Sequence, residues 1–553
     1  MTNRAARSVS LSLLLVLSAG ARAGAQELQP LPGGPARFEA TVQRLADHVG
    51  ERTVLIYGVI GLGSGAVVDP RGTVLTNAHV VAASRYAVLQ WQDGRTVLAR
   101  RRGIDYEHDL AVLEPERPLA GPVPCFSLAD ARPGVGQWVV AGGFPGGLRT
   151  TPQPTISLGT VTGRNEPGAG AQNVMGVLDY QGAIRSDVPI FSGNSGGPLV
   201  DLRGDLVGIN GAVDLERATS LTIPVERLRA ALEVLREGKI LLPGGVALEA
   251  KRNPLLRAFF RGLDAFMKQM PERARRASEA AAEARQAAPE RSAEQAAAER
   301  AAAEALARTA RALPRERPLD AATRAPAALV SREGVLLTAV DARHAVTALG
   351  RLAGRDALEL AEGRAAVIAR DEAHDLALLR LPRPLRRPGL EAPDVPVGSL
   401  VSIGGADGPL ASGIVSAPLR PTSAQVLAQI QEGGEQALGR ALELFGRMAR
   451  TLGSRELLQL VEQIEASLAA RRRFASGTPP RSYPAVLSID APLPPSAVGA
   501  PVADRQGRVI GVATGLGHHG TAYVTPIHEV RRAFRSELGG DLVPRERGRA
   551  RLY

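Results

Sequence analysis

The chain has 553 residues, which is too long for one domain and predicts three or four structural units. Its formal net charge is +11, but only 3% of its residues are aromatic and no nucleic-acid-binding module is recognisable, so we expect no nucleic-acid partner. A single cysteine, Cys125, excludes a framework of disulfides within the chain.

Residues 1–25 have the three parts of a signal peptide. Arg4 and Arg7 precede an apolar run from Leu11 to Leu17, and the small residues from Ala23 to Ala25 offer a cleavage site. The apolar run is short for a membrane span, and a retained anchor is the alternative interpretation. We therefore expect a periplasmic or secreted protein that has no integral membrane span once the signal is removed.

A histidine and an aspartate interrupt strand-like runs in the first half of the chain. His79 lies between Thr76 and Val81, where small and β-branched neighbours leave its ring free to meet a partner. Asp109 opens an apolar run that ends at Leu113, so its carboxylate would be partly buried and would need a partner. The Nδ1–H group of His79 is the natural candidate.

The segment from Phe191 to Pro198 contains Gly-Asn-Ser-Gly-Gly-Pro, in which a serine lies among small residues. Gly193 allows a turn that directs its own N–H group and that of Ser195 to one point, as an oxyanion hole requires. The order His79, Asp109, Ser195 is that of chymotrypsin-type enzymes, and no Gly-x-Ser-x-Gly elbow surrounds Ser195. The three motifs together predict a catalytic triad.

These motifs closely resemble the HtrA-type branch of the trypsin-like serine proteases over roughly residues 50–235. The resemblance includes Gly63-Ser-Gly65 and Thr222-Ile-Pro224. It implies a trypsin-like serine protease domain over residues 37–240, with two six-stranded β-barrels and the triad in the cleft between them. Short Val/Ile/Leu runs separated by turn residues favour an all-β barrel independently. We find no pattern of the PDZ domain that usually follows in this family.

The resemblance also implies a substrate-binding pocket. It puts the pocket floor at Pro189, six residues before the nucleophile, with Ile190 and the strand segment Ser220, Leu221, Thr222 and Ile223 as walls. No carboxylate is available at Pro189 to pair with a cationic side chain, so we expect a preference for small or medium apolar residues before the cut.

Residues 253–314 are predicted to form a helical linker rich in Ala, Arg and Glu. An apolar stripe over 253–270 has helical spacing and should pack on a barrel or a partner, or lie on a membrane surface. Residues 272–312 lack large heptad positions, which favours a solvated spacer over a strong coiled coil. The spacer could hold the barrels tens of Å apart, or fold back at Pro289. Such segments could also support a homo-oligomer.

Residues 326–537 are predicted to be a degenerate second protease-like domain. By matching Gly334–Asp341 to Gly72–His79, the sequence predicts Asp341 at the position of the histidine. Asp375 matches Asp109, and a gapless match of 490–513 to 187–210 predicts Val498 at the position of Ser195. The domain carries a helical insertion over 423–472 and is followed by a basic tail over 538–553.

Three alternatives remain open for chemistry in this second half. Ser496 could act as a nucleophile, His344 could become the base if the alignment slips, and His518-His519 could bind a metal. For Ser496 we favour a constrained turn, and for His344 no catalytic role, because the second half has no serine at the position of the nucleophile. For His518-His519 we favour a surface loop, because no further metal ligand has a recognisable spacing. We therefore expect no metal site.

The sequence thus predicts a mainly β fold of two tandem trypsin-like double β-barrel domains. The predicted function is an exported serine endopeptidase that cleaves protein or peptide substrates, needs no cofactor and carries a C-terminal pseudoprotease domain for regulation or binding. The alternative is an envelope scaffold or binding protein with a gated or vestigial protease domain.

Overall fold

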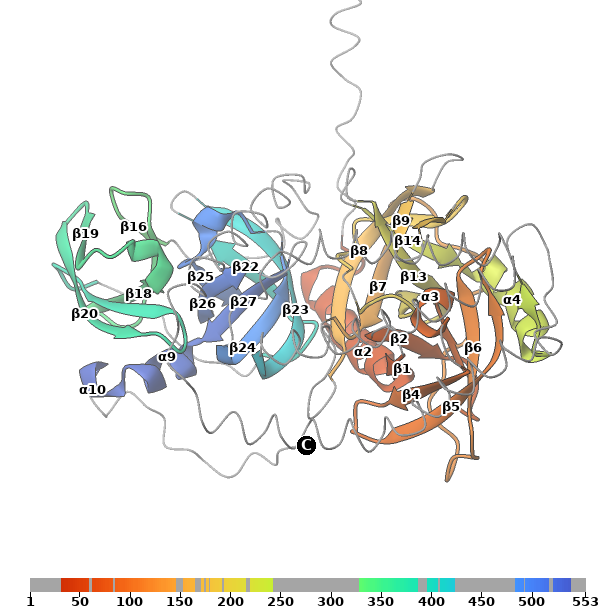
Figure 1. Cartoon of the computed structure of the whole chain (residues 1–553). Coiled ribbons are helices and arrows are strands. Elements are labelled where there is room, and N and C mark those ends of the chain that lie inside the picture. The colour runs from red at the N-terminus through yellow and green to blue at the C-terminus, as the bar shows by residue number, and fades with distance from the viewer. Residues whose placement is uncertain are drawn as a thin grey trace, which may run out of the picture.

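The structure is a computed structural model of the chain (Figure 1). It describes residues 31–241, 328–422 and 483–538, apart from short internal gaps, which are 59–61, 83–84, 146–152, 165–170, 174–175, 179, 191–192, 215–218, 386–394, 406–407, 492 and 517–520. The predicted signal peptide, helical linker, helical insertion and nearly all of the basic tail lie outside the described residues. Within the described part, none of the helices is both long and apolar enough to cross a membrane.

The first sheet of the N-terminal half closes on itself. Its strands run in the order β15-β5-β4-β1-β2-β3-β6, and β5 also pairs with β6. The strands are β1 (Thr53–Tyr57), β2 (Leu62–Val67), β3 (Val74–Thr76), β4 (Tyr86–Gln90), β5 (Thr96–Asp105), β6 (Leu110–Pro115) and β15 (Ile240–Leu241). The short helix α3 (Ala78–Val81) directly follows β3. Fully buried Val, Ile and Leu side chains fill the barrel, as the alternating apolar runs predict.

The second sheet of this half is a closed barrel in the order β11-β14-β13-β12-β7-β8. Its strands are β7 (Trp138–Gly143), β8 (Thr155–Arg164), β11 (Ile184–Ser186), β12 (Pro198–Asp201), β13 (Leu206–Asp214) and β14 (Thr219–Pro224), and a separate pair is formed by β9 (Ala171–Asn173) and β10 (Gly176–Leu178). The segment that contains Ser195 leads into β12, so the second barrel carries the nucleophile and the first carries His79 and Asp109.

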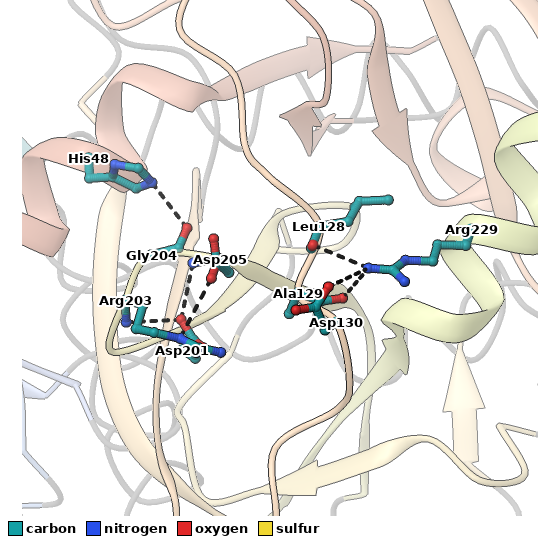
Figure 2. A network of polar contacts seen from close by, with 9 residues as sticks. All are labelled: His48, Leu128, Ala129, Asp130, Asp201, Arg203, Gly204, Asp205 and Arg229. Atoms are coloured by element: carbon teal, nitrogen blue, oxygen red, sulfur yellow. Dashed lines mark hydrogen bonds and ion pairs between the residues drawn. The ribbon is translucent and has the colours of Figure 1, made fainter.

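Two helices pack on the second barrel and are hydrogen-bonded to it. His48 on α2 (Pro35–Arg52) lies 3.0 Å from the carbonyl oxygen of Gly204 in the β12–β13 turn, and Arg229 on α4 (Val225–Arg236) donates to the carbonyl of Ala129 at 2.5 Å (Figure 2). Phe38 on α2 also packs against Trp138 on β7, with ring centroids 4.8 Å apart. Both helices are therefore fixed by polar contacts as well as by the core.

The C-terminal half repeats this architecture. A six-stranded sheet has the order β16-β17-β18-β21-β20-β19, and a closed barrel has the order β22-β23-β24-β27-β26-β25. The first sheet and its helix comprise β16 (Leu329–Val330), β17 (Leu336–Ala339), β18 (His344–Ala348), η3 (Leu349–Leu352), β19 (Ala357–Leu360), β20 (Gly363–Asp371) and β21 (Leu376–Arg380). The barrel and its helices comprise β22 (Leu400–Gly404), β23 (Pro409–Thr422), β24 (Tyr483–Asp490), η4 (Pro495–Ala497), β25 (Pro501–Asp504), β26 (Val509–Leu516), β27 (Thr521–Pro526), α9 (Ile527–Ala533) and α10 (Arg535–Leu538). The predicted mainly β class with two tandem double-barrel units is confirmed.

Strand register corrects the predicted match between the two halves. Thr76 on β3 pairs with Ala111, two residues after Asp109, and Thr347 on β18 pairs with Ala377, two residues after Asp375. The two threonines also make the same bond, since Thr76 Oγ1 donates to Ser64 O and Thr347 Oγ1 donates to Leu336 O, each at 2.7 Å. β18 is therefore the counterpart of β3, and η3 is the counterpart of α3.

The position equivalent to His79 is consequently Gly350, three residues after Thr347, and the prediction of Asp341 there is wrong. Asp341 lies before β18 and hydrogen-bonds His344 Nδ1 at 2.8 Å. A slipped alignment does not make His344 the base either, because His344 is the first residue of β18 and η3 begins only after that strand ends.

The two halves pack directly on each other, with β23 beside β8 and α2 (Figure 1). Leu400 on β22 and Ile414 on β23 are fully buried in one apolar cluster with Phe38, Val42 and Trp138 of the first half. Of the two arrangements left open for the spacer, the one that separates the barrels by tens of Å is therefore wrong for this structure.

Candidate active site

His79 lies on α3, at the end of a buried strand. Its ring Nδ1 is 2.8 Å from Asp109 Oδ2, and its backbone N–H donates to Asp109 Oδ1 at 3.0 Å. His79 is only 5% exposed, so its contact with Asp109 is shielded from water. Two contacts to one carboxylate fix the ring orientation and favour the tautomer that has its proton on Nδ1.

Asp109 is held in a conformation that few non-glycine residues adopt. Its φ angle is +54°, and its backbone carbonyl accepts a hydrogen bond of 3.0 Å from Asn77 Nδ2. Asn77 directly precedes the helix that carries His79. The asparagine therefore ties the aspartate to the histidine segment, and such backbone strain persists only where the surroundings enforce it.

Tyr180 completes the environment of the carboxylate, and the sequence patterns gave no indication of it. Its hydroxyl donates to Asp109 Oδ2 at 2.6 Å, and the residue is 3% exposed. Gly211 on β13 makes room for the ring, because a Cβ atom at that glycine would lie 2.6 Å from Tyr180 Cε1. A tyrosine seven residues before Asp187, paired with a glycine on a neighbouring strand, leaves no local signature in the sequence.

The loop that carries Ser195 is anchored to the first barrel through Ser64 on β2. Ser64 Oγ donates to Gly193 O at 2.6 Å, and Ser64 N donates to Ser195 O at 2.8 Å. Gly193 and Gly196 have φ angles of 103° and 84°, in the region that favours glycine. The motif Gly63-Ser-Gly65 therefore supplies the anchor for the nucleophile loop.

Gly63 brings the histidine helix and the serine loop together. A Cβ atom at Gly63 would lie 2.6 Å from Val80 Cγ1 and 3.2 Å from Ser195 O, so only glycine permits both neighbours to approach. Val80 directly follows His79 on α3. The structure thus brings the helix that carries His79 and the loop that carries the half-buried Ser195 close to the same glycine of β2.

The predicted oxyanion donors are unpaired among the described residues. Neither the N–H group of Gly193 nor that of Ser195 has a hydrogen-bond acceptor in this part of the chain. Buried backbone N–H groups are nearly always paired, so two that have no acceptor among the described residues have the property that an oxyanion hole needs.

The predicted pocket residues have different environments. Pro189 is half-buried, whereas Ile190 is 4% exposed and packs in an apolar cluster with Val161. Leu221 and Ile223 are fully buried in the core cluster of the second barrel, so any contact with a substrate would come from the strand backbone, and the assignment of this segment as a pocket wall stays a prediction. Side chains alternate along a strand, and these two point into the barrel.

The two hydroxyl-bearing residues of this segment point the other way. Ser220 Oγ lies 2.7 Å from Ser186 Oγ, and Thr222 Oγ1 donates to Asn210 Oδ1 at 2.9 Å. Asp187, two residues before Pro189, accepts from Thr160 N at 2.6 Å through Oδ1. Its carboxylate is therefore engaged on β8.

The second half lacks two of the three triad groups. Asp375 retains the acidic position and the unusual backbone, with φ +55° against +54° at Asp109. The gapless match also holds, because Gly499 N donates to Ala513 O at 2.7 Å just as Gly196 N donates to Asn210 O at 2.9 Å. Val498 therefore occupies the position of Ser195.

Two further candidates have no supporting geometry. Ser496, three residues from the nucleophile position, is exposed in the short helix η4. No three His, Cys, Asp or Glu side chains in the described ranges are close enough to hold a metal ion, and His518-His519 lies outside those ranges.

Comparison with known proteins agrees with this geometry. The family model described as "Trypsin-like peptidase domain" matches residues 63–209 and 327–512, which is more than half of the chain. The chain therefore belongs to the trypsin-like peptidase family, and both halves are members.

Individual relatives match only part of this chain. "Serine protease HTRA1B" of Danio rerio is 36% identical over 174 residues, which are 31% of this chain and 34% of the relative. "Probable periplasmic serine endoprotease DegP-like" of Hahella chejuensis is 36% identical over 182 residues, 32% of this chain and 35% of the relative. The chain thus spans about a third of the length of these relatives. The solved serine endoprotease from Yersinia pestis matches with 26% identity and a TM-score of 0.30, covering 35% of this chain and 66% of that one.

Proposed function

We propose that the first barrel pair is a serine endopeptidase with His79 as general base, Asp109 as its orienting carboxylate and Ser195 as nucleophile. The observation that carries the proposal is the 2.8 Å contact between His79 Nδ1 and the buried Asp109 Oδ2 in the half-chain whose loop carries Ser195. Membership of the trypsin-like peptidase family supports the same assignment.

In the proposed reaction, His79 Nε2 takes the proton of Ser195 Oγ as the oxygen attacks the scissile carbonyl carbon. The C–O bond forms and the carbonyl oxygen becomes an oxyanion. Collapse of this intermediate breaks the C–N bond, and the protonated His79 gives its proton to the leaving amine. Water then repeats the sequence on the acyl-enzyme and releases the carboxylic acid.

The N–H groups of Gly193 and Ser195, which have no acceptor in the part of the chain that the structure describes, would hold the oxyanion. Removing one such donor typically slows an enzyme about 100- to 1000-fold. The bond from Ser64 to the carbonyl of Gly193 orients the peptide next to these donors. Asp109 stabilises the charged imidazole that forms during the reaction.

Specificity is proposed to favour small or medium apolar side chains before the cut. Pro189 is the half-exposed member of the predicted pocket, and the Asp187 carboxylate accepts a hydrogen bond from Thr160 N. Ile190 and the β14 segment of Ser220, Leu221, Thr222 and Ile223 remain the proposed walls. A buried cation without a partner is unfavourable, so Arg and Lys should be poor residues at this site.

We propose the second half, residues 326–537, as a pseudoprotease domain that regulates or binds. Gly350 and Val498 support this role, because neither residue can act as a base or a nucleophile. The predicted signal peptide, together with the relative described as periplasmic, supports a periplasmic or secreted location and protein or peptide substrates. Assembly into a homo-oligomer through the helical segments remains a proposal.

The experiment is cleavage of casein and of a short peptide by the full chain and by Ser195→Ala. The variant should lose about six orders of magnitude in rate, as triad loss does elsewhere, while its circular dichroism spectrum is unchanged. Cleavage within tenfold of wild type would refute the assignment. An inactive wild type that also binds partners would favour the scaffold alternative.

A further inference from the structure

The two halves are joined by a surface that contains both apolar and polar contacts. Glu39 on α2 accepts from Leu400 N at 2.9 Å and forms an ion pair of 2.9 Å with Arg505 Nε. Gln43 Nε2 donates to Ser399 Oγ at 3.1 Å. Leu400 and Ile414 are buried beneath these contacts. The second half therefore packs directly on the first through this surface.

One contact of this surface reaches a strand of the candidate protease. Asp490, at the end of β24, accepts a hydrogen bond of 2.9 Å from Leu158 N on β8 through its Oδ2 atom. Both residues are fully buried. Asp490 is the counterpart of Asp187, and Asp187 accepts from Thr160 N on the same strand at 2.6 Å. Each half thus supplies one aspartate to β8.

The reason lies in the pairing of β8. Residues two apart on a strand direct their N–H groups to the same edge, so Leu158 and Thr160 face one side together. β11 pairs with β8 only from Val161 onward. The two carboxylates therefore pair backbone donors on a stretch of β8 that β11 does not reach, and native structures pair nearly all such buried donors.

β8 in turn positions the segment that leads to the nucleophile. Thr160 and Asp187 are joined twice, because Asp187 N also donates to Thr160 O at 3.2 Å. The next residues are Val188, Pro189 and Ile190, and both Val188 and Ile190 pack in one cluster with Val161 of β8. A shift of β8 would therefore move the proposed pocket floor.

We propose that Asp490 is a positioning residue for the protease site, supplied by the half that lacks the triad. By closing the edge of β8 beside Thr160, it fixes the segment from Asp187 to Ile190 and with it the entry to the Ser195 loop. The inference rests on the proposed function of the first half. It assigns the second half a fixed part in the active structure.

The test compares three full-length variants. Asp490→Ala removes the acceptor, Asp490→Asn keeps an oxygen that can accept from Leu158 N, and Arg505→Ala breaks the ion pair to Glu39 on α2 at the same surface. Asp490→Ala should lower kcat/KM for a short peptide between about 10-fold and 100-fold, the size of effect that a small misplacement of a site causes. Asp490→Asn should recover most of the loss, and Arg505→Ala should stay within about twofold of wild type.

Hydrogen exchange of the same proteins separates this inference from the protease assignment, because it needs no activity. Asp490→Ala should speed exchange both in peptides that cover 155–164 and in peptides that cover 183–190, whereas Arg505→Ala should leave the second set unchanged. Faster exchange confined to 155–164 would overturn the positioning role, and so would equal kinetic losses in Asp490→Ala and Arg505→Ala. An inactive wild type with the predicted exchange pattern would contradict the proposed function and support the positioning role.

Discussion

The hydroxyl of Tyr180 and the imidazole of His79 converge on one oxygen atom, Asp109 Oδ2, at 2.6 and 2.8 Å. The aspartate is 1% exposed, so these contacts replace the water that a free carboxylate would bind. Asn77 adds a third contact, to the backbone carbonyl. The carboxylate is therefore fixed by residues from both barrels before any substrate arrives.

Removing this hydroxyl with Tyr180→Phe should slow catalysis without abolishing it. A hydrogen bond to a charged group contributes about 1.5–3 kcal/mol, so kcat/KM should fall roughly 10- to 100-fold. The fall should appear in kcat more than in KM, because the hydroxyl of Tyr180 is bonded to the carboxylate that orients the proposed base. Peptide kinetics provide the measurement, and Tyr57→Phe, which removes a buried hydroxyl bonded to Gln90, is the matched control. Equal losses in the two variants would argue against a role at Asp109.

Cleavage specificity gives an independent test of the pocket. A peptide library should be cut mainly after small or medium apolar residues, because Pro189 carries no charge and Asp187 is bound to Thr160. Mass spectrometry of the cleavage products provides the measurement. Cuts mainly after Arg or Lys would contradict the assigned floor.

Two histidines should change stability with pH in opposite directions. Burial lowers the pKa of His48 below its usual range. Protonation therefore favours the unfolded chain, and the contribution of His48 is present above the unfolded pKa of about 6.5 and is lost as the pH falls below it. The hydrogen bond to Asp105 raises the pKa of His108, so its contribution is present below that value and is lost as the pH rises through the folded pKa.

Urea unfolding midpoints at pH 5 and pH 8 check this assignment. From pH 8 to pH 5, wild type should lose more stability than His48→Gln, because the variant lacks the group that protonates on unfolding. His108→Gln should fall further below wild type at pH 5 than at pH 8. The same pH dependence in all three proteins would show that neither histidine contributes.

The sequence predicted the residues that lie in local motifs and failed where contacts are distant. His79, Asp109 and Ser195 each lie in a short recognisable pattern, and the match of 490–513 to 187–210 has no gap. The match of Gly334–Asp341 to Gly72–His79 was wrong because β17 and β18 are both short apolar strands with the same two-residue alternation. The sequence pattern therefore does not distinguish one of these strands from the next. Hydrogen-bond register alone identified Gly350.

Other features had no sequence signal at all. Tyr180 lies 71 residues from Asp109, and Asp490 lies 332 residues from Leu158. Alternation along β14 buries the side chains of Leu221 and Ile223 in the barrel core, which the prediction of Ser220–Ile223 as one pocket wall did not include. Glu39 contributes to the docking of one half on the other, although its sequence neighbourhood does not distinguish it from an ordinary polar residue of an amphipathic helix.

The most direct test of the central claim is labelling of the full chain with a fluorophosphonate probe, followed by mapping of the modified residue. An activated serine attacks the probe, so the account predicts a single modified residue, Ser195, in wild type. Labelling should disappear in both Ser195→Ala and His79→Ala, because the second half has Val498 and Gly350 at the equivalent positions. Labelling that persists in Ser195→Ala, or that maps to a residue of the second half such as Ser496, would contradict the account.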